Sequence, residues 1–258
     1  DFTSTNLRTN DEFMLEVLNM HFNVYFLLTT PSSKIRQFCE PYVIALRSLN
    51  ITHPERFSKV KVIEEIIRNR RNVADYHDKR PLAIIIFPKK DYNRAMEKAT
   101  SFEALIKGYR VVYYEVSSDQ EFVKAVQEAT QVRPASLLEI AGHGRMNTVA
   151  FGTFPFLLSE VTDEKLYLDT TDESQLHVLT PFIERGAHVI LKSCSTGLGR
   201  DTMPNVANMI SKIWPQATIY AHEIETNNVI EVDENGLFRS PGYETTLVYT
   251  IPPKIKNK

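Results

Sequence analysis

The chain has 258 residues, of which 43% are hydrophobic, so it can bury the core of one main domain and a smaller extension. Its 30 basic and 32 acidic residues give a formal net charge of -2, which argues against broad electrostatic binding to nucleic acid or to an anionic membrane. Only two cysteines occur, Cys39 and Cys194, so the composition predicts no disulfide framework. We expect a reducing compartment, the cytoplasm, with secretion into a host cell as the alternative.

The N-terminal part of the chain is predicted to be helical. Apolar residues recur at helical spacing in three stretches, residues 11–30, 33–49 and 54–76. The most apolar run, residues 13–28, is too short and too polar to span a bilayer, and it lacks the basic flank of a signal peptide. We therefore expect a helical region over residues 1–79, which could bind a regulatory protein partner, and a second domain over residues 80–258.

From residue 81 onward, the pattern changes to strands that alternate with helices. Apolar runs predict five strands, over residues 82–87, 109–116, 136–141, 187–192 and 217–222. Shorter strands are expected over residues 148–151 and 165–168, and a hairpin with an edge strand over residues 228–252. A capping box formed by Ser118 and Glu121 predicts the start of one connecting helix. The predicted fold class is α/β, a mainly parallel sheet flanked by helices, behind an N-terminal helical layer.

Two of the predicted strands end on a histidine and a cysteine. One strand leads to His143, which lies between two glycines, and the other leads to Cys194 and a turn rich in small residues. Because sites in open parallel sheets lie at the carboxyl ends of strands, we expect His143 beside Cys194. An imidazole can take the proton of a thiol and return it to a leaving amine, while the amides of Cys194 and Gly144 bind the oxyanion. This chemistry is acyl transfer, most simply peptide hydrolysis.

The two sequence boxes resemble those of the caspase-like cysteine peptidases, which include caspases, gingipains, legumain, separase and the bacterial CHAT domains. Ala-Gly-His-Gly, residues 141–144, looks like the histidine box, and Leu-Lys-Ser-Cys-Ser-Thr-Gly-Leu-Gly, residues 191–199, looks most like the CHAT cysteine box. The histidine precedes the cysteine by 51 residues (194 − 143), against about 50 in caspases. The resemblance covers residues 80–223 and implies a caspase-like fold. It implies three roles: nucleophile for Cys194, general base and acid for His143, and oxyanion contributor for Gly144.

The resemblance also implies where a specificity pocket would lie. Lys192 and Ser193 stand where caspases have Gln-Ala before the cysteine, a neighbourhood that lines the pocket in caspases together with the loop after the first strand. A cationic pocket built from Lys192 with Lys89, Lys90 or Arg94 would favour an acidic residue before the cleaved bond. No metal or organic cofactor is implied.

Other interpretations of the same residues stay open. An isolated cysteine at a strand end is most often a small core residue, so the domain could be a catalytically silent interaction module. A thiol acyltransferase or a ubiquitin-type hydrolase could use the same dyad. His188 and His222 with one cysteine do not make a zinc site, which usually needs three or four ligands. The interpretation we favour is a cysteine endopeptidase that acts on a protein or peptide substrate.

Overall fold

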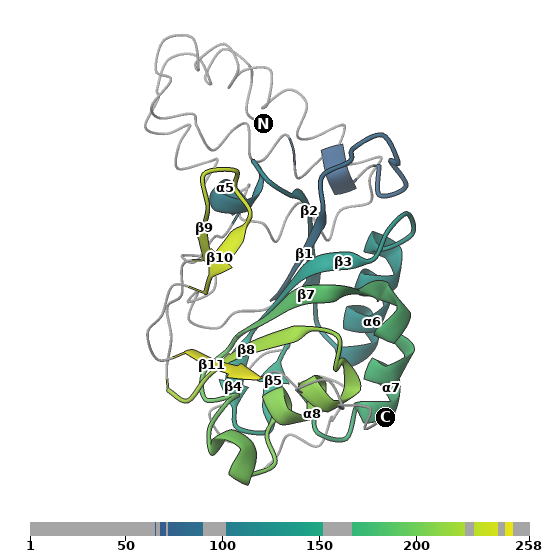
Figure 1. Cartoon of the computed structure of the whole chain (residues 1–258). Coiled ribbons are helices and arrows are strands. Elements are labelled where there is room, and N and C mark those ends of the chain that lie inside the picture. The colour runs from purple at the N-terminus through teal and green to yellow at the C-terminus, as the bar shows by residue number, and fades with distance from the viewer. Residues whose placement is uncertain are drawn as a thin grey trace, which may run out of the picture. The chain divides into compact units, whose positions relative to one another are not determined.

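The computed structural model describes residues 65, 68–70, 72–89, 102–151, 167–224, 230–241 and 246–249. The chain divides into two units, Asp1–Asn72 and Val73–Lys258. Residues 65 and 68–70 are helical, but residues 72–79 form turns and irregular structure, so the expected helical region is wrong at its C-terminal end. The rest of that region lies outside the described residues. The larger unit is an α/β domain (Figure 1).

The centre of the larger unit is a six-stranded, mainly parallel sheet. Its strands are β1 (Leu82–Pro88), β2 (Arg110–Val116), β3 (Ala135–Ala141), β7 (Ile183–Lys192), β8 (Thr218–His222) and β11 (Thr246–Tyr249), in the spatial order β11-β8-β7-β3-β1-β2. The first five are parallel, and β11 is an antiparallel edge strand beside β8. The five strands and the edge strand predicted from apolar runs are confirmed, and so is the α/β class.

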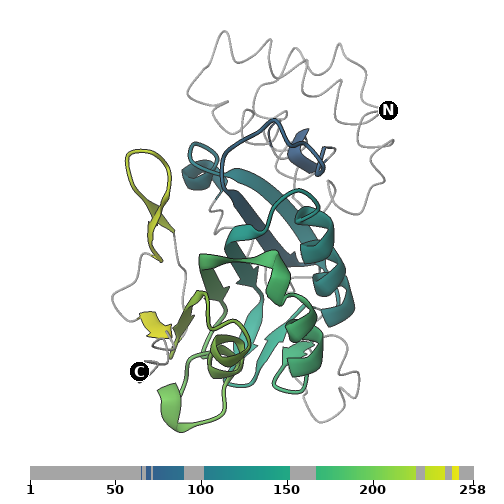
Figure 2. The ribbon, with the colours of Figure 1, turned by 45° about the vertical axis from the view of Figure 1, so that its right-hand side comes forward.

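One face of this sheet packs against three helices, α6 (Asp119–Ala129), α7 (Glu173–Val178) and α8 (Val206–Ile213). Alternate strand residues such as Ile84, Leu138 and Val189 are fully buried against apolar helix residues such as Phe122 and Ile210. Figure 2 shows the helices gathered on this side. Among the described residues, no helix is both long and apolar enough to cross a bilayer.

The start of α6 is set by the capping box that the sequence predicts. The Ser118 hydroxyl accepts a hydrogen bond from the Glu121 amide at 3.1 Å. The Glu121 carboxylate accepts from the amide and the hydroxyl of Ser117, at 2.8 and 2.9 Å, and not from Ser118. The return bond of the box therefore falls one residue earlier than in the standard pattern.

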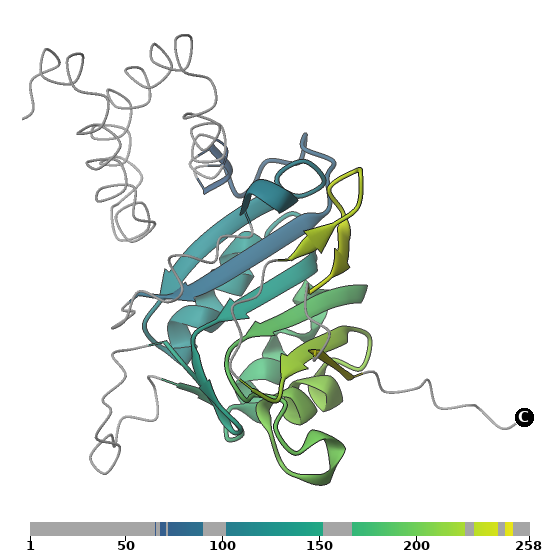
Figure 3. The ribbon, with the colours of Figure 1, turned by 90° about the vertical axis from the view of Figure 1, so that its left-hand side faces the viewer.

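The opposite face of the sheet carries the short helix α5 (Phe102–Leu105) and a hairpin of β9 (Glu231–Val232) and β10 (Phe238–Ser240), as Figure 3 shows. This confirms the hairpin expected within residues 228–252, and its turn contains Gly236, which has a φ of 79°. The ring of Phe238 packs on His188 of β7 and Tyr220 of β8, with centroid distances of 4.5 and 5.2 Å. An aromatic contact therefore fixes the hairpin on the sheet.

A separate three-stranded antiparallel sheet consists of β4 (His143–Arg145), β5 (Thr148–Ala150) and β6 (Tyr167–Asp169). The sequence predicts β5 and β6 but not β4, because β4 is only three residues long and contains a glycine. Two 3-10 turns complete the described elements, η4 (Thr180–Phe182) and η5 (Arg200–Thr202). In Figure 1, β4, β5 and α8 lie together at the lower end of the central sheet.

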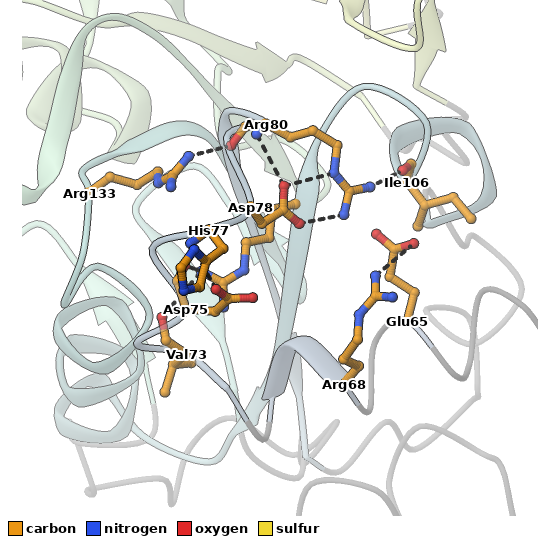
Figure 4. Close-up of polar contacts among 10 residues, drawn as sticks. Glu65, Arg68, Val73, Asp75, His77, Asp78, Arg80, Ile106 and Arg133 are labelled. Carbon is orange, nitrogen blue, oxygen red and sulfur yellow. Dashed lines mark hydrogen bonds and ion pairs between the residues drawn. The ribbon is translucent and has the colours of Figure 1, made fainter.

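The segment before β1 belongs to the larger unit, so the division falls before Val73, whereas the sequence pattern places it before residue 80. Arg110, which is 2% exposed, donates to the carbonyl oxygens of Val73 and Asp75 at 3.3 and 2.9 Å. Figure 4 labels the two acceptor residues, Val73 and Asp75. Arg80 donates to both carboxylate oxygens of Asp78, and this bond lowers the pKa of Asp78. These arginine contacts hold residues 73–80 at the N-terminal edge of the sheet.

Candidate active site

His143 and Cys194 come from the ends of adjacent central strands. In the β3 and β7 pair, Ala141 lies opposite Lys192, and the Gly142 amide donates to the Lys192 carbonyl at 3.3 Å. The two strands therefore end level with each other. His143 and Cys194 each lie two residues beyond this last pair, at the same C-terminal edge of the sheet.

The loops that follow these strands are in direct contact. The hydroxyl of Ser193, a residue that is 1% exposed, donates to the Gly142 carbonyl at 2.6 Å. A Cβ placed on Gly144 would lie 2.4 Å from the Cys194 carbonyl oxygen and 2.9 Å from the Cys194 nitrogen. A side chain at position 144 would thus collide with main-chain atoms, and glycine alone fits. This close approach places the backbone of the histidine box on the backbone of the cysteine.

The turn after Cys194 contains a strained residue and is held in place by backbone hydrogen bonds. Ser195 has a φ of 59°, a left-handed conformation that costs a non-glycine residue about 1 kcal/mol or more. The amides of Ser195 and Gly197 donate to the carbonyls of Ile224 and His222, at 3.3 and 2.9 Å. This alternate-residue pattern is that of an antiparallel strand pair, and it ties the turn to the continuation of β8. Strained residues held in this way are concentrated at functional sites.

The two candidate catalytic side chains differ in their main-chain setting. His143 is the first residue of β4 and pairs with Ala150, so the small antiparallel sheet fixes its backbone. Cys194 lies in the turn, is half-buried and forms no disulfide. A half-buried thiol remains accessible to a reagent or a substrate, in contrast to a fully buried structural cysteine.

Lys192 is buried and paired with an acidic residue, whereas the cationic-pocket hypothesis needs its charge at the substrate. Its ammonium lies 3.2 Å from a carboxylate oxygen of Glu139, and the two side chains are 4% and 0% exposed. It also lies 5.7 Å from the centre of the Phe87 ring. The positive charge is therefore compensated inside the protein. Ser193 is likewise buried and bonded to the histidine box, and Lys90 and Arg94 lie outside the described residues.

Sequence reasoning missed Glu139, although a signal was present. Glu139 stands inside the apolar run Leu-Leu-Glu-Ile-Ala of β3, and a carboxylate in a fully buried strand needs a buried partner. Lys192, the last residue of the predicted strand over residues 187–192, was a candidate for this partner. Lys192 lies two residues before Cys194, and Glu139 lies four residues before His143, so the pair is a fixed internal feature close to the candidate site.

Two further histidines, His188 in β7 and His222 in β8, lie on the same face of the central sheet as each other. Burial lowers the pKa of His222 to about 4 and lowers the pKa of His188, whose ring nitrogen lies 3.0 Å from the Tyr220 hydroxyl. Both imidazoles are therefore neutral at pH 7. Within the described residues, no three His, Cys, Asp or Glu side chains gather as a metal site would require.

No family model matches this chain, and no curated protein matches it. The assignment of the site therefore rests on the two sequence boxes and on the geometry that joins them. That geometry consists of level strand ends, a glycine pressed against the cysteine, and a strained turn held by hydrogen bonds. A thiol, an imidazole and main-chain amides are the groups that acyl transfer by a cysteine nucleophile uses.

Proposed function

We propose that this chain is a cysteine endopeptidase of the caspase-like type, with Cys194 as the nucleophile and His143 as the general base and acid. The observation that carries the proposal is the contact between the two boxes, in which Gly144 approaches the Cys194 backbone too closely for any other residue. Peptidases need a protein or peptide as substrate, and no metal or organic cofactor enters the chemistry proposed here.

In the proposed reaction, His143 takes the thiol proton and the Cys194 sulfur attacks the carbonyl carbon of the scissile bond. The negative charge on the carbonyl oxygen is stabilised by the Cys194 and Gly144 amides, and one such donor contributes about 3 kcal/mol. The tetrahedral intermediate collapses when His143 gives its proton to the leaving amine. Water then attacks the thioester, with the same imidazole as base, and releases the acid product and the free thiol.

A preference for an acidic residue before the cleaved bond stays a prediction that concerns Lys89, Lys90 and Arg94. Lys192 no longer supports it, because Glu139 compensates the charge of that lysine. We therefore base the proposal on the dyad alone and leave the preference to the cleavage assay.

The test is mass-spectrometric profiling of a diverse peptide library with wild type, Cys194→Ala and His143→Ala. His177→Ala is a matched control, because His177 is an exposed histidine on α7, and its loss should leave cleavage unchanged. We expect cleavage by wild type and by the control and at least a hundredfold loss in both dyad variants. Cleavage that survives in Cys194→Ala would refute the proposal.

The alternative functions predict different outcomes in the same assay. A thiol acyltransferase would yield peptides joined to an added amine instead of hydrolysed ends. A silent interaction module would cleave nothing, and its Cys194 would not react with an electrophilic peptide ketone at neutral pH. Either result would replace the peptidase proposal.

A further inference from the structure

Three large apolar side chains are exposed around the turn that follows Cys194. Leu198, Met203 and Ile224 are 44%, 47% and 57% exposed. The other large apolar side chains exposed among the described residues are distributed over separate elements, namely Tyr76, Val178 and Leu237. We call Leu198, Met203 and Ile224 the apolar rim.

Hydrogen bonds connect the rim to the candidate nucleophile. The Ile224 carbonyl accepts from the amide of Ser195, the residue after Cys194, and the Leu198 amide donates to the Ser195 carbonyl at 3.0 Å. Met203 lies against Gly199, where a Cβ would be 2.7 Å from the Met203 Cβ. The backbone of the apolar rim therefore starts within about 10 Å of Cys194, a distance that about three extended residues span.

The rim is rigidly presented by polar contacts beneath it. The Asn205 side chain, at the start of α8, donates to the carbonyls of Leu198 and Arg200 at 3.2 and 2.8 Å. The Asn208 side chain donates to the Met203 carbonyl at 2.9 Å. Because the rim backbone is already fixed, binding of a ligand to these side chains costs little conformational entropy of the protein.

The charges beside the rim compensate each other. Arg200 donates to both carboxylate oxygens of Glu223, at 3.2 and 3.3 Å, and this pair bridges the turn and the continuation of β8. The surface next to Cys194 therefore presents apolar side chains and a neutral ion pair. Apolar side chains that are exposed together on a rigid segment are typical of a binding surface.

We propose that the apolar rim binds the substrate chain, so that the preferred substrates carry a large apolar side chain, such as Leu or Phe, within three residues of the scissile bond. The occupant is a peptide because the rim is hydrogen-bonded to the turn that carries Cys194, where the scissile carbonyl of a substrate would lie. This inference rests on the proposed peptidase function. It adds a specificity that neither the cysteine box nor the cationic-pocket hypothesis contains.

The test measures binding separately from cleavage. Fluorescein-labelled octapeptides that the library assay identifies, or a fixed random set if it identifies none, are prepared in pairs with Leu or Ser at one position. Binding to Cys194→Ala is measured by fluorescence anisotropy, with and without the substitutions Leu198→Ser, Met203→Ser and Ile224→Ser. We expect the Leu peptides to bind about tenfold more tightly than their Ser partners, and the difference to disappear in the triple variant.

Val178→Ser with Leu237→Ser is the matched control, since both residues are exposed and remote in sequence from the turn, and it should keep the discrimination. Equal binding of Leu and Ser peptides to the unaltered rim would overturn the inference. So would a wild-type chain that dimerises through the rim, with a dimer that the triple variant abolishes. Discrimination in binding without any cleavage by wild type would instead refute the peptidase proposal and leave the rim as a peptide-binding surface.

Discussion

The two ends of the parallel sheet are stabilised by different means. At the C-terminal edge, main-chain atoms meet directly, and Gly144 lies against Cys194 with no room for a side chain. At the N-terminal edge, arginine side chains stabilise the sheet end: Arg110 donates to the carbonyls of Val73 and Asp75. Arg133 donates to the carbonyl of Arg80 (Figure 4). The candidate site therefore depends on backbone geometry, which is insensitive to most surface substitutions but intolerant of added volume.

The largest expected effect comes from the ion pair beneath the C-terminal edge. Glu139→Gln removes the counter-charge of the buried Lys192 ammonium, and we expect about 4 kcal/mol of lost stability in urea unfolding. The double variant Glu139→Met with Lys192→Met should be more stable than Glu139→Gln, because it removes both buried charges. A double variant that is less stable than the single one would show that the pair itself stabilises the fold.

Acidification should weaken the same edge through His222. Its folded pKa of about 4 lies below the unfolded value of 6.5, so the unfolded state binds the proton first as the pH falls. The associated stability is fully present above pH 6.5 and is lost toward pH 4, in total about 3 kcal/mol. In urea unfolding between pH 7 and pH 4.5, His222→Gln should show a flatter pH dependence than wild type. Parallel curves would contradict this assignment.

Added volume at the candidate site should affect both stability and cleavage. Gly144→Ala brings a methyl group within 2.4 Å of the Cys194 carbonyl, so we expect a loss of about 2 kcal/mol and at least a tenfold lower kcat/KM. Gly186→Ala is the contrast, because nothing lies within 4 Å of its Cβ and its cost comes from a φ of 84°. Gly186→Ala should lower the unfolding midpoint and leave kcat/KM unchanged. Equal loss of cleavage in both variants would point to general unfolding instead of site geometry.

The smallest effect is expected at the N-terminal edge. Arg110→Met loses the hydrogen bonds to the carbonyls of Val73 and Asp75 but keeps a side chain of similar length, so we expect a loss of about 1.5 kcal/mol. Peptide cleavage should be unchanged, since the candidate site lies at the other edge. Arg239→Met, on the exposed side of β10, should change the unfolding midpoint little. A loss of cleavage in Arg110→Met would show that the two edges are coupled.

The sequence predicts those parts of the fold whose signal is local. Apolar runs identify the strands, Ser118 and Glu121 mark the start of α6, and the turn residues ending at Gly236 mark the hairpin. The shared edge of His143 and Cys194 is also predictable, because parallel strands that are adjacent in a sheet end on the same side.

Contacts between distant residues were not predictable in the same way. The apolar run around Glu139 indicates that its carboxylate needs a buried partner, but no local pattern says that this partner is Lys192, which is distant in sequence. Strand β4, His143–Arg145, contains no apolar residue and so gives no strand signal. The turn at Ser195 is held by a carbonyl of Ile224 far along the chain. The division before Val73 likewise depends on Arg110, which is distant in sequence.

The contacts that anchor the β9–β10 hairpin determine whether the two fragments would stay together after a cut in the hairpin. Gly108 and Gly236 approach so closely that a Cβ on either would collide with the other's backbone, and Phe238 packs on the sheet. Beyond the hairpin, β11 pairs with β8. A protease that nicks the chain near Asp233 would therefore produce two fragments in denaturing electrophoresis, while the native protein would still elute as a single particle.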